Sequence, residues 1–253
     1  MRKESKELTF AIKAAKEAGK ITLDQFEKFK DVSYKPGEEI VTDVDVKAER
    51  KIKEIIKKHF PKHNILAEEE GEDFVSSSDY LWIIDPVDGT VNYSRGIKLY
   101  GISIALAKNN EVVLGVVYNP IFDELFTTER GKGAFLNGKK IKVSSENELF
   151  KTVIYSTELF RTKEIIKNLF DRVRNLRITS SSAYETCLVA CGKVDAYIKV
   201  TNVPWGFAAA NLIVEEAGGR VTNFDGSKWN IHSKNILSSN GILHEKILSL
   251  LEK

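Results

Sequence analysis

Apolar residues in the first part of the chain recur at intervals of three and four, which is the spacing of one buried helix face. This spacing predicts a helix over residues 6–29. It predicts a second helix from about Val44 to Phe60, which Pro61 ends because proline cannot continue the helical hydrogen bonds. Two amphipathic helices are therefore expected to open the chain, each with one face to bury against another layer.

Short apolar runs then replace the helical spacing, as is typical of strands. Two of them, Asn64–Ala67 and Tyr80–Ile84, predict buried strands. Three more predict consecutive antiparallel strands of one sheet: Leu99–Ala107, Val112–Tyr118 and Glu124–Thr128. The first part of the chain, to about residue 150, is therefore predicted to be rich in sheet.

Helical and strand patterns alternate from about residue 151 to 253. The predicted helices cover about 162–174, 182–191, 204–217 and 242–252. The predicted strands are Ala196–Val200, Arg220–Asn223 and Ile236–Ser238. No linker or repeat divides the chain, so residues 1–253 are expected to form a single domain. The predicted fold is an α/β (α+β) layered sandwich, in which helix layers cover sheets.

Composition and charge exclude several classes of protein. The chain has 253 residues with 38 basic and 36 acidic side chains, a net charge of +2, so nothing indicates nucleic-acid binding. No apolar run reaches the ~20 residues of a membrane span, and the N-terminus lacks a signal-peptide pattern. Two cysteines, Cys187 and Cys191, are expected to be reduced core residues. A cytoplasmic protein is expected.

The sharpest chemical signal is the segment Leu81–Thr90, in which an apolar strand ends in Asp85, Pro86, Val87 and Asp88. Two carboxylates this close repel each other unless a cation lies between them. Mg²⁺ or Mn²⁺ suits oxygen ligands, and the Val87 carbonyl could add another. A plain Asp-Pro turn remains an alternative at this point.

A second apolar strand, Asn64–Ala67, also ends in carboxylates, at Glu68, Glu69 and Glu70. A run of glutamates by itself is usually a solvated surface. Next to another strand that ends in carboxylates, it becomes a plausible set of metal ligands.

Several motifs in this order resemble the inositol monophosphatase family of Mg²⁺-dependent sugar-phosphate phosphatases. The resemblance is carried by Ile40–Asp45, Ala67–Glu69, Trp82–Tyr93, Gly131–Gly138 and Pro204–Gly219. It covers nearly the whole chain, and several spaced motifs are far more specific than one. It implies the layered fold shared with fructose-1,6-bisphosphatase, and a homodimer.

The resemblance also implies roles for individual residues. Glu68, Asp85 and the Val87 carbonyl would hold one Mg²⁺, and Asp85 and Asp88 a second. The remaining implied roles concern water and substrate. Thr90, paired with Asp45, would help to orient the attacking water, so that Glu68, Thr90 and Asp45 are the expected catalytic residues. The N–H groups of Gly89 and Thr90 would bind the phosphate at a helix N-terminus, and Ser180, Ser181 and Ser182 would lie beside the sugar hydroxyls.

The chain departs from the family pattern at Gly206, where the family has an aspartate that is a metal ligand. Glycine has no side chain to replace it. Three interpretations stay open: a phosphatase weakened by this loss, an inactive member that binds a phosphate ligand or regulates a partner, and an engineered substitution.

The substrate is poorly determined by the sequence. Lys199 stands where inositol-specific members tend to have an acidic residue, and a lysine there could receive a second phosphate. The expected substrate is a small phosphate ester, either inositol monophosphate or a related sugar phosphate. Fructose 1,6-bisphosphate and an adenosine bisphosphate are the alternatives.

Overall fold

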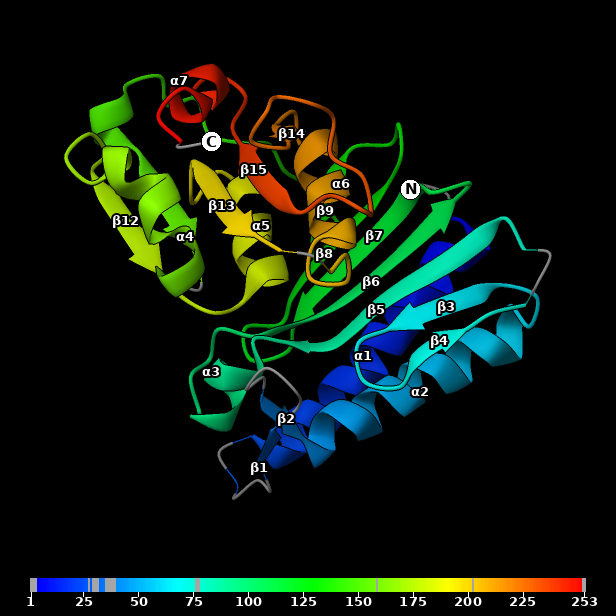
Figure 1. Ribbon diagram of the computed structural model, residues 1–253. Helices are drawn as coiled ribbons and strands as arrows, with labels where there is room; N and C mark the ends of the chain where they lie inside the picture. Colours follow the sequence, from blue (N-terminus) through cyan, green and yellow to red (C-terminus); the bar gives the residue numbers. More distant parts are fainter. Residues whose placement is uncertain are drawn as a thin grey trace.

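The computed structural model describes residues 4–26, 28, 32–34, 40–75, 78–157, 159–201 and 203–251. Figure 1 shows two main sheets, with helices between them and on their outer faces. The predicted layered sandwich of sheets and helices is therefore confirmed.

The larger sheet has eight strands in the order β10-β9-β8-β7-β6-β5-β3-β4. Their bounds are β3 (Asn64–Ala67), β4 (Gly71–Asp73), β5 (Tyr80–Asp88), β6 (Gly101–Lys108), β7 (Glu111–Asn119), β8 (Glu124–Glu129), β9 (Ala134–Leu136) and β10 (Lys139–Lys140). β5 pairs parallel with β3 and antiparallel with β6, and β6, β7 and β8 form the predicted antiparallel run. Because β3 and β5 are parallel, their C-terminal ends lie at the same edge of the sheet.

The smaller sheet has five strands in the order β12-β11-β13-β15-β14. Their bounds are β11 (Val153–Ser156), β12 (Asn175–Ile178), β13 (Ala196–Val200), β14 (Arg220–Thr222) and β15 (Asn235–Ser239), and a separate pair joins β1 (Val32–Tyr34) to β2 (Ile40–Thr42). β11 and β12 were not predicted from the sequence. β12 is a largely exposed edge strand, so it lacks the apolar alternation that identifies a strand.

The helices are α1 (Lys6–Gln25), α2 (Asp43–His59), α3 (Thr90–Ser94), α4 (Leu159–Ile166), α5 (Ser182–Ala190), α6 (Ala208–Glu216) and α7 (His244–Leu248). The helix predicted over 6–29 is too long, because Phe26 already has extended backbone, and residues 27 and 29 lie outside the described part. The helix predicted over 162–174 is also wrong in its bounds. α4 begins earlier, and a 3₁₀ turn at Lys167–Leu169 follows it.

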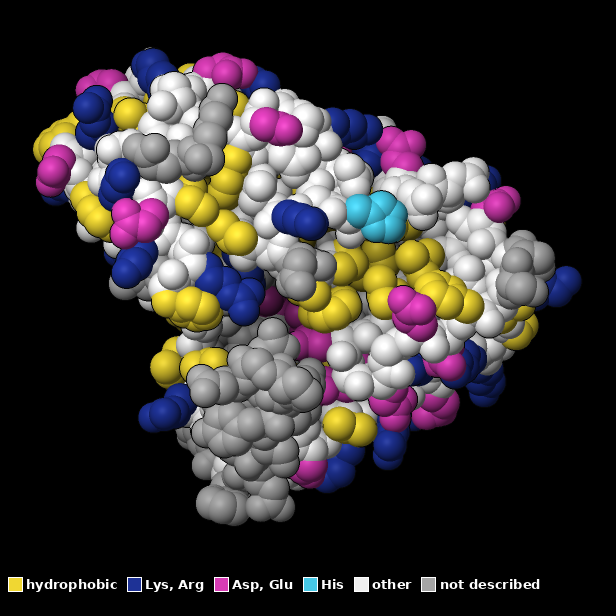
Figure 2. Space-filling view, in the orientation of Figure 1, with side chains coloured by type: hydrophobic (Ala, Val, Ile, Leu, Met, Phe, Trp, Pro, Cys, Tyr) yellow, Lys and Arg dark blue, Asp and Glu magenta, His cyan; other side chains and the backbone are white. Residues whose placement is uncertain are grey.

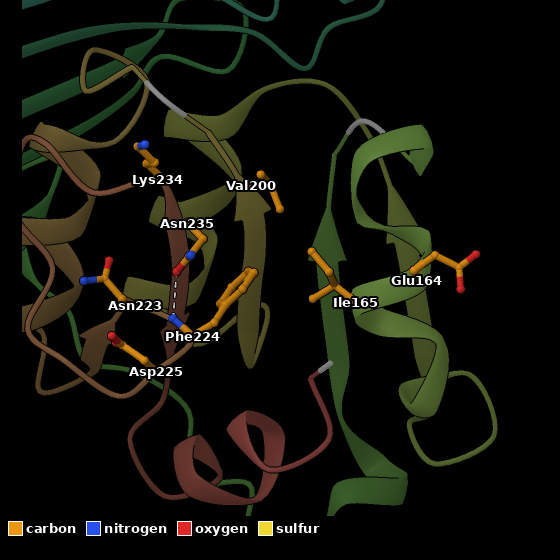
Figure 3. Close-up of a pocket in the computed structure, with 8 residues that line it drawn as sticks. All are labelled: Glu164, Ile165, Val200, Asn223, Phe224, Asp225, Lys234 and Asn235. Atoms are coloured by element: carbon orange, nitrogen blue, oxygen red, sulfur yellow. Dashed lines mark hydrogen bonds between the residues drawn. The ribbon is translucent and has the colours of Figure 1, made fainter. Parts of the chain in front are cut away.

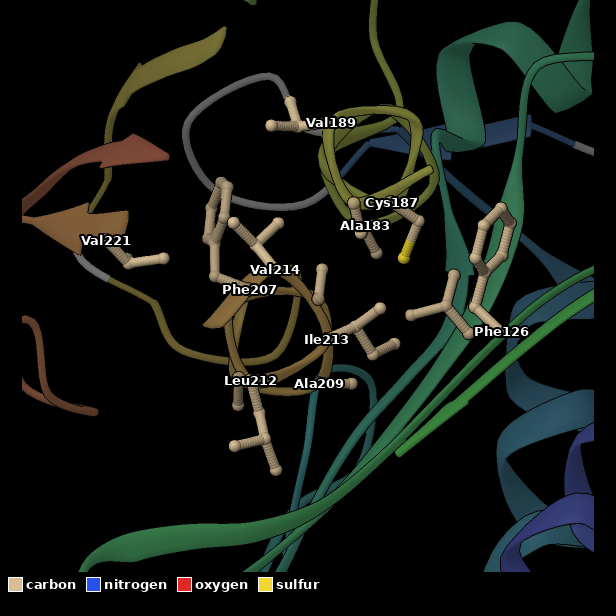
Figure 4. Packing of buried hydrophobic residues seen from close by; sticks show 14 of the residues in the cluster. Phe126, Ala183, Cys187, Val189, Phe207, Ala209, Leu212, Ile213, Val214 and Val221 are labelled. Atoms are coloured by element: carbon tan, nitrogen blue, oxygen red, sulfur yellow. The ribbon is translucent and has the colours of Figure 1, made fainter. Parts of the chain in front are cut away.

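Strand alternation divides the apolar side chains of the larger sheet between two cores. Trp82 and Ile84 of β5 pack with α1 and α2, whereas Ile83 points to the other face, toward α5 and α6. Figure 4 shows side chains of α5 and α6 packed together, with Phe126 of β8 beside them. Cys187, a free and buried thiol, lies in this core, as expected for a reduced core cysteine. A third core lies under α4 and α7 on the far face of the smaller sheet.

The α5–α6 layer approaches the sheet most closely at Gly115 of β7. A Cβ placed on Gly115 would lie 2.6 Å from the Ala209 carbonyl oxygen of α6, a backbone atom that cannot rotate away. We therefore expect Gly115→Ala to lower the free energy of unfolding by about 1–3 kcal/mol, because the helix has to shift.

The matched control for this prediction is Gly101→Ala in β6. There the nearest atoms lie 3.4 Å or more from the added Cβ, so we expect a neutral effect or a gain of up to about 1 kcal/mol. Urea unfolding of both variants measures the difference. Equal effects would contradict the close approach of α6 to β7.

His244 of α7 is fully buried, and its two ring nitrogens lie 2.9 Å from Thr222 Oγ1 and 2.8 Å from Ser239 Oγ. Burial first, and then the Arg220 charge, lower the pKa of His244 to about 4. His244 is therefore protonated below about pH 6.5 in the unfolded chain, but only below about pH 4 in the folded chain.

This difference predicts a pH dependence of stability. The His244 contribution is fully present above about pH 6.5 and is lost as the pH falls toward 4, by up to about 3 kcal/mol. We expect wild type to lose more unfolding free energy than His244→Asn between these pH values, as measured by urea titrations. Parallel losses in the two proteins would show that folding does not lower the pKa of His244.

Candidate metal and phosphate site

Asp85 and Asp88 reach one side of the sheet because β5 is irregular between them. β5 pairs with β6 up to Asp85, and the register shifts before Asp88. Pro86 has no N–H to continue the ladder, so a bulge forms there. In a regular strand, residues three apart point to opposite faces. The irregularity instead lets both carboxylates approach Gly206, at the start of α6.

Asp88 is held by the N-terminus of α5. Its Oδ2 atom accepts hydrogen bonds from Ser181 Oγ at 2.6 Å, from the Ala183 N–H at 2.9 Å and from the Tyr184 N–H at 3.3 Å. Burial raises the pKa of Asp88 to about 6, although these donors and the Lys199 ammonium oppose the rise. The helix end therefore fixes one oxygen, and Oδ1 faces Gly206.

Asp85 is buried without enough partners. Its Oδ1 atom is buried with no hydrogen-bond partner in the structure. Burial first, and then the charges of Glu68 and Asp88, raise the pKa of this carboxyl well above its usual range. A buried carboxyl oxygen without a donor is costly, and a cation would satisfy it.

Glu68 lies close enough to Asp85 for its charge to be, after burial, the largest influence that raises the pKa of Asp85. Glu49 of α2 holds the turn that carries Glu68 through two hydrogen bonds. The buried Glu49 carboxylate accepts the N–H groups of Glu69 at 2.7 Å and Glu70 at 2.8 Å. Glu49 was not predicted from the sequence. It is one of several charged residues of α2, and the sequence pattern does not reveal that its partner lies twenty residues away.

Thr90 and Asp45 meet as the resemblance implies. The Thr90 hydroxyl lies 3.0 Å from Asp45 Oδ1 and 3.0 Å from the Val87 carbonyl oxygen. The other Asp45 oxygen accepts the Thr42 N–H at 3.0 Å and so caps α2. Asp45 is buried, and through these two hydrogen bonds it links the start of α2 to Thr90.

Gly89 has the left-handed backbone conformation, with φ of 97°, which places its N–H group in the turn before α3. A Cβ at this position would lie 2.9 Å from the Ser180 carbonyl oxygen, so only glycine fits. The helix that follows, α3, has only five residues. Its dipole is therefore weaker than that of a longer helix, and it would attract a phosphate less strongly.

The three serines do not share one role. The hydroxyl of Ser181 is buried and donates to Asp88. The expected position beside the sugar hydroxyls therefore does not suit Ser181, and for Ser180 and Ser182 it stays a prediction. Ser182 Oγ accepts hydrogen bonds from Lys199 Nζ at 3.0 Å and from the Tyr197 hydroxyl at 3.3 Å.

Gly206 is buried opposite the two aspartates. A Cβ placed on it would lie 3.4 Å from Ser182 Cβ, 3.6 Å from Asp88 Oδ1 and 3.8 Å from Asp85 Oδ2, which are ordinary contact distances. A side chain therefore fits there. An aspartate at 206 would bring its carboxylate close to Asp85 and Asp88, and the glycine leaves the cluster without that group.

The donor set suits a hard divalent cation. All the converging groups are oxygens, and Figure 2 shows acidic side chains gathered in a hollow of the visible face. Within the described ranges, however, no group of three or more His, Cys, Asp or Glu side chains is arranged as a ready ligand set for one ion. The two ions that the resemblance implies would each be held by two carboxylates at most, so such a group is not required.

A separate hollow of about 730 Å³ lies beside the smaller sheet and contains none of the predicted site residues. Figure 3 shows Phe224 and Ile165 lining it, while Glu164 of α4 points away. Its walls are mainly apolar and offer no cluster of carboxylates, so despite its size it is not suited to binding a metal ion and a phosphate.

The model of the inositol monophosphatase family matches residues 3–253. The chain belongs to this family. A fructose-1,6-bisphosphatase/inositol-1-monophosphatase of Thermotoga maritima is 39% identical over 97% of this chain and 96% of its own length. The Nus factor SuhB of Salmonella typhimurium is 36% identical over 92% and 91%. The solved structure of the extragenic suppressor protein suhB from Bartonella henselae has a TM-score of 0.94, with 34% identity over 98% and 99%. No described helix is long and apolar enough to cross a membrane.

The proximity of the carboxylates can be tested by comparing protein stability with and without Mg²⁺. We expect Asp85→Asn to raise the melting temperature in EDTA, because it removes a poorly solvated carboxyl. The same variant is expected to lose the Mg²⁺-induced stabilisation of wild type, which is about 2.7 kcal/mol at 100 times the dissociation constant.

Thermal unfolding in EDTA and in excess Mg²⁺ checks this prediction, with Asp171→Asn, an exposed aspartate, as the control. If Asp85→Asn kept a wild-type response to Mg²⁺, the cation would have to bind elsewhere.

Proposed function

We propose that this chain is a Mg²⁺-dependent phosphomonoesterase that hydrolyses inositol monophosphate or a related sugar phosphate. The observation that carries the proposal is the buried Asp85 oxygen without a partner, beside Glu68 and Asp88. Membership of the inositol monophosphatase family supports it, as does the name of the Thermotoga maritima relative.

The residues present fit a metal-assisted hydrolysis. Glu68, Asp85 and the Val87 carbonyl would hold one Mg²⁺, and Asp85 and Asp88 a second; Mn²⁺ has the same ligand preference. When bound, these ions neutralise the phosphate and lower the pKa of water. Without the carboxylate that the family has at 206, more Mg²⁺ is needed for the same occupancy.

The chain's own groups would position the reactants. The N–H groups of Gly89 and Thr90, at the turn that begins α3, would donate to a bound phosphate. The Thr90 hydroxyl, fixed by Asp45, would hold the attacking water in line with the ester. Asp45 orients that hydroxyl and at the same time caps α2, so the water position is tied to the rigid helix.

Phosphate release tests the proposal. We expect turnover of inositol 1-phosphate that requires Mg²⁺ and falls at least about 100-fold in Asp85→Asn. Fructose 1,6-bisphosphate and an adenosine bisphosphate are compared in the same assay, since each is an alternative substrate. No turnover of any of the three by wild type at tens of millimolar Mg²⁺ would reject the enzymatic proposal.

Gly206 favours one other candidate, a member that binds a phosphate ligand or regulates a partner without turnover. A relative named Nus factor SuhB is consistent with this candidate. It predicts saturable binding of inositol 1-phosphate with no phosphate released, so the same assay decides between the two. The homodimer, the cytoplasmic location and the single-domain organisation stay predictions.

A further inference from the structure

Lys199, on β13, lies next to the position where the family's aspartate is missing. Its Nζ atom is 3.0 Å from Ser182 Oγ and 5.4 Å from the centre of the Phe207 ring. Ser182 Cβ is in turn 3.4 Å from a Cβ placed on Gly206. The ammonium and the glycine therefore flank the same serine.

The Lys199 charge also acts on two carboxyls of other elements. Asp88 of β5 and the fully buried Glu185 of α5 both have their pKa lowered by the Lys199 charge, against the larger opposing effect of burial. One oxygen of Glu185 accepts the Ser181 N–H at 3.2 Å, and the other is buried without a hydrogen-bond partner. Lys199 thus supplies positive charge to carboxyls that are otherwise poorly compensated.

The two departures from the family pattern change the charge in the same direction. The resemblance implies an aspartate at 206 and, in inositol-specific members, an acidic residue at 199; this chain has Gly206 and Lys199 there. Both changes make the surroundings of Asp88 more positive, and so reduce the need for a metal ion beside it.

We propose that Lys199 and Gly206 form a compensating pair, in which the Lys199 ammonium is a fixed cation in place of the metal ion that an aspartate at 206 would help to hold. The inference rests on the proposed function, because it requires that the Asp85 end binds a divalent cation. The substitution Gly206→Asp alone is then insufficient, since the introduced carboxylate would form an ion pair with Lys199 rather than hold a metal.

Counting bound Mn²⁺ by equilibrium dialysis and electron paramagnetic resonance tests the pair directly. The proteins are wild type, Gly206→Asp, Lys199→Gln and the double variant, with Lys199→Met as a second neutral replacement should Lys199→Gln fail to fold. Lys193→Gln is the matched control, because Lys193 shortly precedes β13 and pairs with Glu124, 2.7 Å away. Melting curves in EDTA verify that each variant is folded.

We expect the double variant to bind one more Mn²⁺ per chain than wild type. Gly206→Asp alone is expected to bind that extra ion at least about tenfold more weakly. Lys193→Gln combined with Gly206→Asp should behave as Gly206→Asp alone.

Three results would overturn the pair. The first is an extra ion in Gly206→Asp as tight as in the double variant, and the second is no extra ion in either. In the third, every variant binds as many Mn²⁺ ions as wild type, and Lys199→Gln binds fructose 1,6-bisphosphate more weakly. That result would show that Lys199 binds a second phosphate instead. If wild type itself bound no Mn²⁺, the proposed function would fall as well. Wild-type binding without coupling between 199 and 206 would remove only this inference.

Discussion

The repulsion between carboxylates gathered at two neighbouring strand ends, of which Asp85 and Asp88 are buried, is the constraint on which the site depends. β3 and β5 are parallel, so Glu68 and Asp85 reach the same edge of the larger sheet. Water is largely excluded there, and the like charges cannot all be present without a compensating cation. Burial first, and then the charges of Glu68 and Asp88, therefore raise the pKa of Asp85 well above its usual range. A divalent ion would compensate these charges and would also satisfy the free oxygen of Asp85.

The surrounding fold holds the carboxylates in this costly arrangement. Glu49 fixes the turn at Glu68 from α2, and the N-terminus of α5 fixes Asp88 from the opposite side. Asp45 joins α2 to Thr90. The supporting side chains Glu49, Asp45 and Ser181 are themselves buried, which restricts how far the carboxylates can move apart. This is the preorganisation that phosphoryl chemistry requires.

Much of this could be predicted from the sequence, because the signals were local. The strand before Asp85, the Pro86 break and the glutamates after Ala67 are each visible in a few consecutive residues. The supports of the site were not visible, since Glu49 and Ser181 act on groups far away in the chain. β12 was missed because an exposed edge strand has no apolar period, and α4 was misplaced because its helical pattern is short. Sequence patterns therefore predicted which carboxylates lie together, while the tertiary contacts that position them needed the structure.

The central claim is that the free oxygen of Asp85 is a ligand for a divalent cation. Crystals of the wild-type protein soaked in Mn²⁺, with diffraction data collected at a wavelength where manganese scatters anomalously, test it most directly. We expect an anomalous peak in contact with Asp85 and Glu68. Well-ordered density for both carboxyls, with no anomalous peak beside them at saturating Mn²⁺, would contradict it.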